Sequence, residues 1–159
     1  MSKPINDIKQ RLRSYRDKLT KDLKNQQLRL DRIEMRLTSI GSPSLSDMPR
    51  SSSGPFDRTS YWVAQKVDLE SEVVSLQNEL IEEWKDIELI IKKLKNSEEK
   101  AVIRMRYHDG MEWNDITDTM FGDKDDYLDK VDTYQRRVFR LHGQALVNMS
   151  AIENKKENL

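Results

Sequence analysis

Apolar residues recur at spacings of three and four along the first forty residues. After Pro4, which suits a first helical turn because it lacks an N–H group, no glycine or proline interrupts the pattern before residue 41. The steps form a heptad seam with one stutter, an additional four-residue step, between Leu19 and Leu23. This pattern predicts one helix of about 35 residues with a single buried face. The seam consists of Ile5, Ile8, Leu12, Tyr15, Leu19, Leu23, Gln26, Leu30, Ile33, Leu37 and Ile40.

A second heptad seam follows, with its own stutter between Leu80 and Trp84. Residues 41–55 separate the seams and hold three of the four prolines and six serines, a composition typical of a flexible loop. Two long seams joined by such a loop predict an antiparallel helical hairpin, a coiled coil over residues 1–96, in which residue 21 pairs near residue 82. The pairing can form within one chain or between two chains. The second seam consists of Trp62, Lys66, Leu69, Val73, Leu76, Leu80, Trp84, Ile87, Ile91 and Leu94.

Residues 97–150 have the pattern of a helix-turn-helix domain. A short helix, capped by Asn96 with Glu99 completing a capping box, ends at Gly110, which suits a left-handed turn. A second short helix is expected to start near Trp113, and an acidic connector leads to a long last helix. Residues 151–159 are polar, and we expect them to fray as a tail. The buried stripe of the last helix is predicted to be Val138, Leu141, Ala145 and Met149.

Another face of the last helix carries side chains that can read DNA bases. An arginine can donate two hydrogen bonds to guanine, and a glutamine can form two with adenine. The candidates on this face are Gln135, Arg136, Phe139 and Arg140.

Two phrases of this stretch resemble known transcription proteins. Arg-Met-Arg-Tyr at 104–107, Trp113 and Ile116, followed by Arg137-Val138, Leu141 and Ala145-Leu146, resembles the fourth region of bacterial sigma factors. The phrases RYHDGMEWNDI and YQRRVFRLHGQAL resemble phage-encoded regulators of the ArpU and RinA type. Compared with the sigma-factor pattern, the chain has additional residues at 122–132, and Phe139 stands where a base-contacting arginine is usual.

The resemblance covers the last third of the chain and implies a function. It implies that double-stranded promoter DNA is bound in the cytoplasm of a bacterial host, where the protein activates phage late genes with host RNA polymerase. By this resemblance Gln135, Arg136, Phe139 and Arg140 would face bases. Tyr134 and Arg137 would contact phosphates.

The charge distribution changes this picture. Net charge is zero, but residues 1–40 carry 11 Lys or Arg against 5 Asp or Glu, and residues 101–159 carry 9 against 11. A slightly acidic DNA-reading segment favours DNA binding that depends on RNA polymerase or on a second subunit. We interpret the basic first helix mainly as a surface complementary to the acidic second seam.

Enzymatic and metal-dependent functions lack support in the sequence. The chain has no cysteine, and His108 and His142 have no metal-ligand spacing. The aspartates near residues 115–126 lack the order of a calcium loop. No apolar run is typical of a signal peptide or a membrane span. We therefore expect no enzyme activity, cofactor, metal or membrane partner.

The sequence thus predicts an all-α DNA-binding regulator that forms a homodimer through its coiled coil, because a two-helix layer leaves apolar surface exposed. The alternative is a protein-interaction adaptor that docks on RNA polymerase or another regulator without touching DNA.

Overall fold

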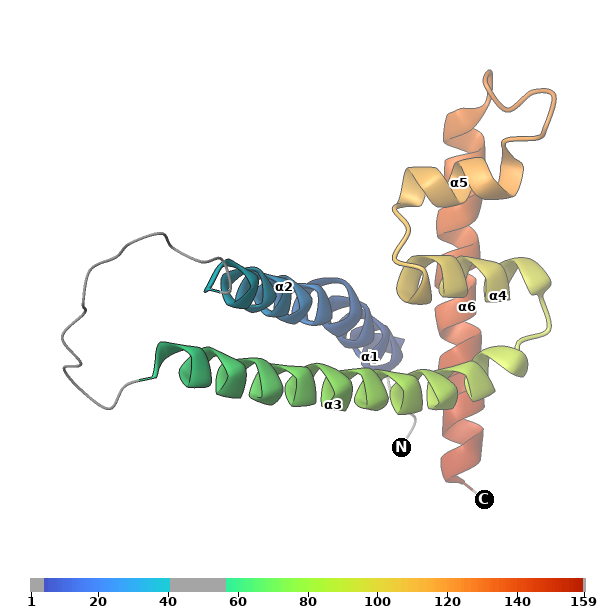
Figure 1. The fold of residues 1–159 in the computed structure, drawn as a ribbon. Coiled ribbons are helices and arrows are strands. Elements are labelled where there is room, and N and C mark those ends of the chain that lie inside the picture. Colours follow the sequence, from blue (N-terminus) through green and yellow to red (C-terminus); the bar gives the residue numbers. More distant parts are fainter. Residues whose placement is uncertain (1–4, 41–56, 159) are drawn as a thin grey trace. The chain divides into compact units, whose positions relative to one another are not determined.

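The computed structural model describes residues 5–40 and 57–158, which contain helices and no strands (Figure 1). α1 (Ile5–Asp17), η1 (Lys18–Asp22) and α2 (Leu23–Ile40) follow one another without a break. α3 (Arg58–Lys92) is a continuous α-helix of 35 residues. The all-α class and both long helices are therefore confirmed. The predicted loop at 41–55 lies outside the described residues.

The stutter in the first seam coincides with a change in helix type. η1 is a π-helix, and it covers both Leu19 and the residue before Leu23. Two consecutive four-residue steps exceed the 3.6 residues of an α-helical turn, so an unbroken α-helix would rotate these side chains out of the seam. A π turn contains more residues and therefore keeps Tyr15, Leu19 and Leu23 facing the same way.

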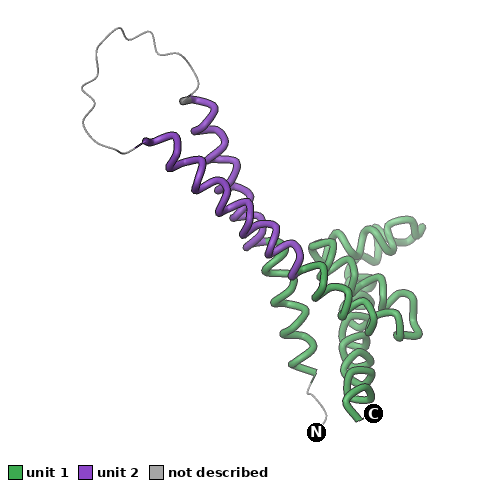
Figure 2. The backbone as a smooth tube through the Cα atoms, turned by 60° about the horizontal axis from the view of Figure 1, so that its bottom comes forward, with its two compact units in different colours: residues 1–20, 80–159 green, residues 21–79 purple. Residues whose placement is uncertain are grey.

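The chain forms two compact units, residues 1–20 with 80–159 and residues 21–79 (Figure 2). The domains predicted from the sequence were residues 1–96 and residues 97–150. The compact units differ from that division because α1 packs against helices near the end of the chain.

In the unit of residues 21–79, α2 and the first part of α3 lie side by side (Figure 2). Lys66 Nζ lies 3.5 Å from a carboxylate oxygen of Glu34, and the guanidinium of Arg36 lies 4.6 Å from the ring centre of Trp62. These pairs run in opposite chain directions, as the antiparallel prediction requires. Leu30, Leu69 and Val73 are buried in the seam, and the remaining seam residues that are described here are half-buried.

In the other unit, α4 (Ser97–Ile103) and α5 (Trp113–Phe121) both pack against α6 (Val131–Glu157). Their apolar side chains meet in one core. Thr117 is buried as well, and its hydroxyl donates to the Trp113 carbonyl at 2.8 Å. The core consists of Val102, Ile116, Phe121, Tyr127 and Val138.

α1 belongs to the same unit and packs against α6 and the π-helix η2 (Arg104–His108). The hydroxyl of Tyr15 shares a 2.8 Å hydrogen bond with His108 Nδ1, and the rings of Tyr15 and His108 both stack on Trp84. Burial, together with the charge of Glu83, raises the pKa of Tyr15 to about 12, so this hydroxyl stays protonated.

α6 continues as a helix into the predicted polar tail and ends at Glu157. Arg11 on α1 donates a 3.0 Å hydrogen bond to the carboxylate of Glu153 and so anchors this end of the helix. The sequence alone could not predict this anchor, because only the packing of α1 against α6 brings Arg11 next to Glu153.

The predicted helix ends are largely confirmed. Asn96 caps α4, its Oδ1 accepting the N–H of Glu98 at 2.9 Å, and α5 begins at Trp113. Gly110 has a φ of +69°, the left-handed conformation expected for it. Glu99, which was predicted to complete the capping box, has another role. Its carboxylate is buried and accepts a hydrogen bond from Asn148 Nδ2 on α6 at 3.0 Å.

Candidate nucleic-acid interface

The exposed side of α6 carries two arginines, Arg136 and Arg140. Val138, Ala145 and Met149 are fully buried, which directs the opposite side of the helix to solvent. Arg136 and Arg140 lie four residues apart on that side and are exposed. Within residues 5–40 and 57–158, neither has a hydrogen-bonding or ion-pair partner. Their guanidinium groups are therefore available to a ligand.

Phe139 lies between these arginines in sequence and is 44% exposed. Its ring makes an edge contact with Trp113 at 5.2 Å between ring centres. The contact fixes the direction of an aromatic side chain that reaches solvent. Arg136, Phe139 and Arg140 together are called the arginine face of α6 below.

The other three predicted site residues are engaged within the protein. Gln135 Nε2 donates to Asn114 Oδ1 at 2.6 Å. Arg137 donates to both carboxylate oxygens of Glu98 at 3.0 Å, and its guanidinium lies over the ring of Phe121. Each of these contacts joins α6 to α4 or α5, so the two side chains help to hold α6 in place.

Tyr134 is engaged in the connection between α5 and α6. Its hydroxyl donates to Asp126 Oδ1 at 2.6 Å, and its ring stacks on Phe121. This hydrogen bond raises the pKa of Tyr134 and lowers the pKa of Asp126, which also pairs with Lys130 at 2.9 Å. Of the additional residues at 122–132, Tyr127 is buried in the core, whereas Leu128 is exposed.

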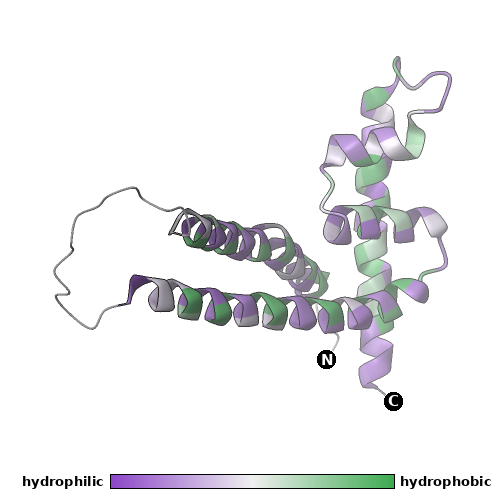
Figure 3. Cartoon of the chain, in the orientation of Figure 1, coloured by the Kyte–Doolittle hydropathy of each residue, from purple (hydrophilic) through white to green (hydrophobic). Residues whose placement is uncertain are grey.

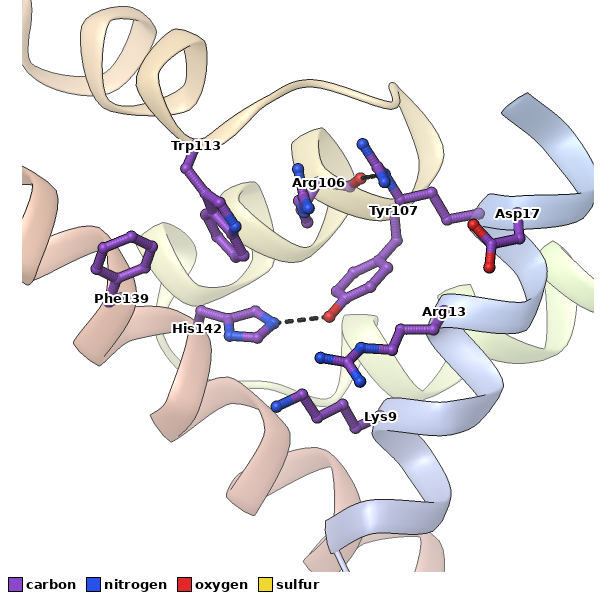
Figure 4. Close-up of a pocket in the computed structure, with 9 residues that line it drawn as sticks. Lys9, Arg13, Asp17, Arg106, Tyr107, Trp113, Phe139 and His142 are labelled. Carbon is purple, nitrogen blue, oxygen red and sulfur yellow. Dashed lines mark hydrogen bonds between the residues drawn. The ribbon is translucent and has the colours of Figure 1, made fainter. Parts of the chain in front are cut away.

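A pocket of about 410 Å³ opens where α1, η2, α5 and α6 meet (Figure 4). Figure 4 shows Lys9 and Arg13 extending from α1 toward His142 on α6. The pocket, called the cationic pocket below, combines four cations with aromatic rings and one carboxylate. It is lined by Lys9, Arg13, Arg16, Asp17, Arg106, Tyr107, Trp113, Phe139 and His142.

Two of the four cations in the cationic pocket, Arg16 and Arg106, share the single carboxylate of Glu112. Arg16 and Arg106 each donate to its carboxylate, at 2.8 and 3.1 Å. These hydrogen bonds, that of Arg106 above all, lower the pKa of Glu112. Arg16 Nε also donates to the Arg106 carbonyl at 3.1 Å, and the Arg106 guanidinium lies 4.5 Å from the ring centre of Trp113.

The other two cations have no carboxylate partner. Within the described parts of the chain, no ion pair or hydrogen bond engages Lys9 or Arg13. Their effect is visible at His142, whose ring shares a 2.8 Å hydrogen bond with the Tyr107 hydroxyl. Burial first, then the charges of Lys9, Arg106 and Arg13, lower the pKa of His142 to about 4. The pocket therefore keeps a net positive charge, because its four cations stand against two carboxylates, that of Asp17 in its lining and that of Glu112.

Sequence reasoning did not identify the cationic pocket. It assigned the basic residues of the first helix to pairing with the acidic second seam, and it had no reason to connect α1 with α6. The sequence feature that could have indicated the pocket is the basic composition of residues 1–20, which hold six Lys or Arg against two Asp or Glu.

Among the described residues, no group of histidine and carboxylate side chains is arranged to hold a metal ion. None of the described helices combines the length and the apolar character that crossing a bilayer requires. No protein-family model, curated protein or solved structure matches this chain.

Proposed function

We propose that the protein is a DNA-binding transcription regulator that contacts base edges in the major groove with the arginine face of α6. The observation that carries the proposal is the exposure of Arg136 and Arg140, unpaired and four residues apart, on a helix whose other side is fixed by α4 and α5. Guanidinium groups in that position can donate paired hydrogen bonds to guanine. α5, the turn at 122–130 and α6 then act as a helix-turn-helix.

Three of the predicted site residues, Gln135, Arg137 and Tyr134, make contacts within the protein, which reduces the set of base-contacting residues that we propose. The side chains that we propose to contact bases are Arg136, Phe139 and Arg140. The other three side chains position α6, with Arg137 held by Glu98 and Tyr134 by Asp126. Contact of Tyr134 or Arg137 with phosphate would require these hydrogen bonds to break. We therefore assign them to the structure of the domain.

The last third of the chain resembles sigma-like phage regulators, and this resemblance suggests the target, the partner and the biological outcome. On that basis we propose promoter DNA as the target, host RNA polymerase as a partner and late-gene activation as the outcome. A homodimer joined through the long helices would present two copies of the arginine face to paired half-sites. Val67, Val74 and Ile81 form an exposed apolar stripe on α3, which supports such a dimer.

The test starts with selection of bound duplexes from a randomised DNA pool, since the target sequence is unknown. The enriched duplex is then titrated by fluorescence anisotropy with the parent and with the double variant R136A/R140A. We expect the variant to bind at least tenfold more weakly, because a lost base contact costs about 1–3 kcal/mol. The matched control is K155A/K156A, which removes the same charge from exposed positions near the other end of α6.

If both double variants weaken DNA binding equally, the arginine face contributes only its charge. That result would contradict the assignment of base contacts to this face. Failure of the parent to enrich any sequence would instead favour the adaptor function, in which this domain docks on RNA polymerase. Co-purification of the parent with RNA polymerase would then be the next measurement.

A further inference from the structure

The cationic pocket has features that the proposed base-reading role does not use. Lys9 and Arg13, which have no ion-pair partner among the described residues, come from α1, outside the predicted DNA-reading segment. They lie four residues apart and therefore on the same side of the helix. Figure 4 shows both side chains extending into the space in front of Tyr107 and His142. Two convergent cations without a carboxylate partner provide an anion-binding arrangement.

The second pair of cations adds to this arrangement. Arg16 and Arg106 share one carboxylate, that of Glu112, which is largely exposed. One carboxylate compensates only part of two guanidinium charges. Burial is the main cause of the low pKa of His142, and the charges of Lys9, Arg106 and Arg13 lower this pKa further, because a protonated ring would add another positive charge beside them. An anion in the pocket would relieve this repulsion.

We propose that the cationic pocket binds a phosphate group. Phosphate accepts several charge-assisted hydrogen bonds at once, and guanidinium and ammonium groups are its usual protein partners. The pocket volume of about 410 Å³ is sufficient for a phosphate that is part of a larger ligand. Phe139 belongs both to this pocket and to the arginine face of α6, so the two surfaces are contiguous.

This contiguity gives the phosphate two sources. One source is the DNA backbone beside the bases that the arginine face contacts. This possibility rests on the proposed function. The other is a free phosphorylated molecule of nucleotide size. In both cases Lys9 and Arg13 neutralise the phosphate, and in the first case α1 becomes part of the DNA interface.

The first experiment tests phosphate binding without DNA. Sodium phosphate and adenosine monophosphate are titrated at pH 7 against the full-length protein, with sodium chloride as the reference at equal ionic strength. NMR follows the ring C–H signals of His142 and the indole N–H signal of Trp113, assigned with His142→Asn and Trp113→Phe. We expect saturable shifts of both signals in the parent and their loss in K9Q/R13Q. The matched control K24Q/R29Q changes two exposed cations of α2 and should respond like the parent.

The second experiment measures the salt dependence of binding to the selected DNA duplex. Each phosphate contact contributes about 0.9 to the slope of log affinity against log salt concentration. If the pocket binds the DNA backbone, K9Q/R13Q lowers the slope by about 0.9 or more and leaves the preferred sequence unchanged. K24Q/R29Q should retain the parent slope.

The outcomes separate the two sources and the two proposals. Saturable shifts with an unchanged DNA slope would assign the pocket to a free phosphorylated ligand. Absence of saturable shifts together with an unchanged slope would overturn the phosphate site, even if the parent binds DNA. If the parent binds no DNA, the proposed function fails, but the NMR titration still decides whether the pocket binds phosphate.

Discussion

Gly110 is the residue at which the backbone itself requires glycine. Its φ of +69° lies in the left-handed region, and a Cβ built there would lie 3.2 Å from Thr20 Cγ2. We expect Gly110→Ala to lower the free energy of unfolding by about 1–2 kcal/mol, because an L-residue is strained in this conformation. Urea unfolding followed by circular dichroism measures the change.

Gly143 provides the matched control. It lies inside α6, and a Cβ at this position would meet no atom within 4 Å. Gly143→Ala should therefore raise the free energy of unfolding by about 0.5–1 kcal/mol, since alanine favours a helix interior over glycine. Equal effects of the two substitutions would contradict the assignment of Gly110 to a strained turn.

His142 should make stability depend on pH between about 4 and 6.5. In the folded protein its pKa is lowered to about 4, so the unfolded chain takes up this proton first as the pH falls. The folded state is therefore fully stable above pH 6.5 and loses roughly 2–3 kcal/mol, at most, as the pH falls to 4. Urea unfolding at a series of pH values measures this loss.

The comparison variant is His142→Asn, which has no ring to protonate. Its free energy of unfolding should be lower than that of the parent at pH 7, because the hydrogen bond to Tyr107 is altered. The difference between the two proteins should shrink as the pH falls to 4. A constant difference across this range would show that His142 is not buried beside the cations of the pocket.

At the residue scale, local spacing predicted burial well and predicted partners poorly. Of the predicted stripe, Val138, Ala145 and Met149 are fully buried, and Leu141 is half-buried against the core. The engagement of Arg137 with Glu98 did not follow, because 39 residues separate the two in the chain. Only the packing of α4 on α6 brings them together.

At the scale of elements, Gln26 is a weak point in the packing of α2 against α3. It occupies a seam position, and its Oε1 is buried without a hydrogen-bond partner in the part of the chain that the structure describes. Gln26→Leu should raise the free energy of unfolding by about 1–3 kcal/mol, because it removes an unsatisfied buried oxygen at similar side-chain volume. Thermal unfolding followed by circular dichroism tests this expectation.

The neighbouring Gln27→Leu is the control for this substitution. Gln27 is exposed and donates to Asp31 at 3.0 Å, so leucine there fills no seam position. Its effect should be close to zero or slightly destabilising. If Gln26→Leu is no more stabilising than Gln27→Leu, the seam at Gln26 is more open to water than its burial indicates.

Heptad steps of three and four were sufficient to predict both long helices and their antiparallel direction. The stutter marked the position of η1, but spacing alone does not distinguish a π turn from a change in supercoiling. The second stutter illustrates this, because α3 remains α-helical across Leu80 and Trp84. The contact of α1 with α6 involves residues at opposite ends of the sequence, and periodicity contains no information about it.

At the scale of the whole molecule, α3 carries apolar residues on a second side, away from the seam. Hydrophobic residues recur along the entire helix (Figure 3). Val67, Val74 and Ile81 are spaced by seven residues, and each is more than half exposed. Such a stripe on a helix that already buries one seam is typical of a surface that pairs with another helix.

If a second copy of this chain covers the stripe, as the proposed homodimer requires, an antiparallel arrangement is favoured. Alignment about Val74 places Val67 opposite Ile81 of the second copy and Glu70 near Gln77 of the second copy. A parallel arrangement would set Glu70 against itself, and like charges in that position repel. An antiparallel pair would also be closed by two-fold symmetry, so association would stop at the dimer.

The double variant V67D/V74D tests this dimer, because it places two carboxylates on the stripe of each copy. Light scattering after gel filtration should give the parent twice the 18.8 kDa chain mass and the variant a single chain mass. A64D/S75D adds the same charge on another exposed side of α3 and should remain dimeric. A parent that elutes as a monomer at micromolar concentration would exclude the stripe as the dimer contact. Each arginine face would then have to bind DNA alone or with RNA polymerase.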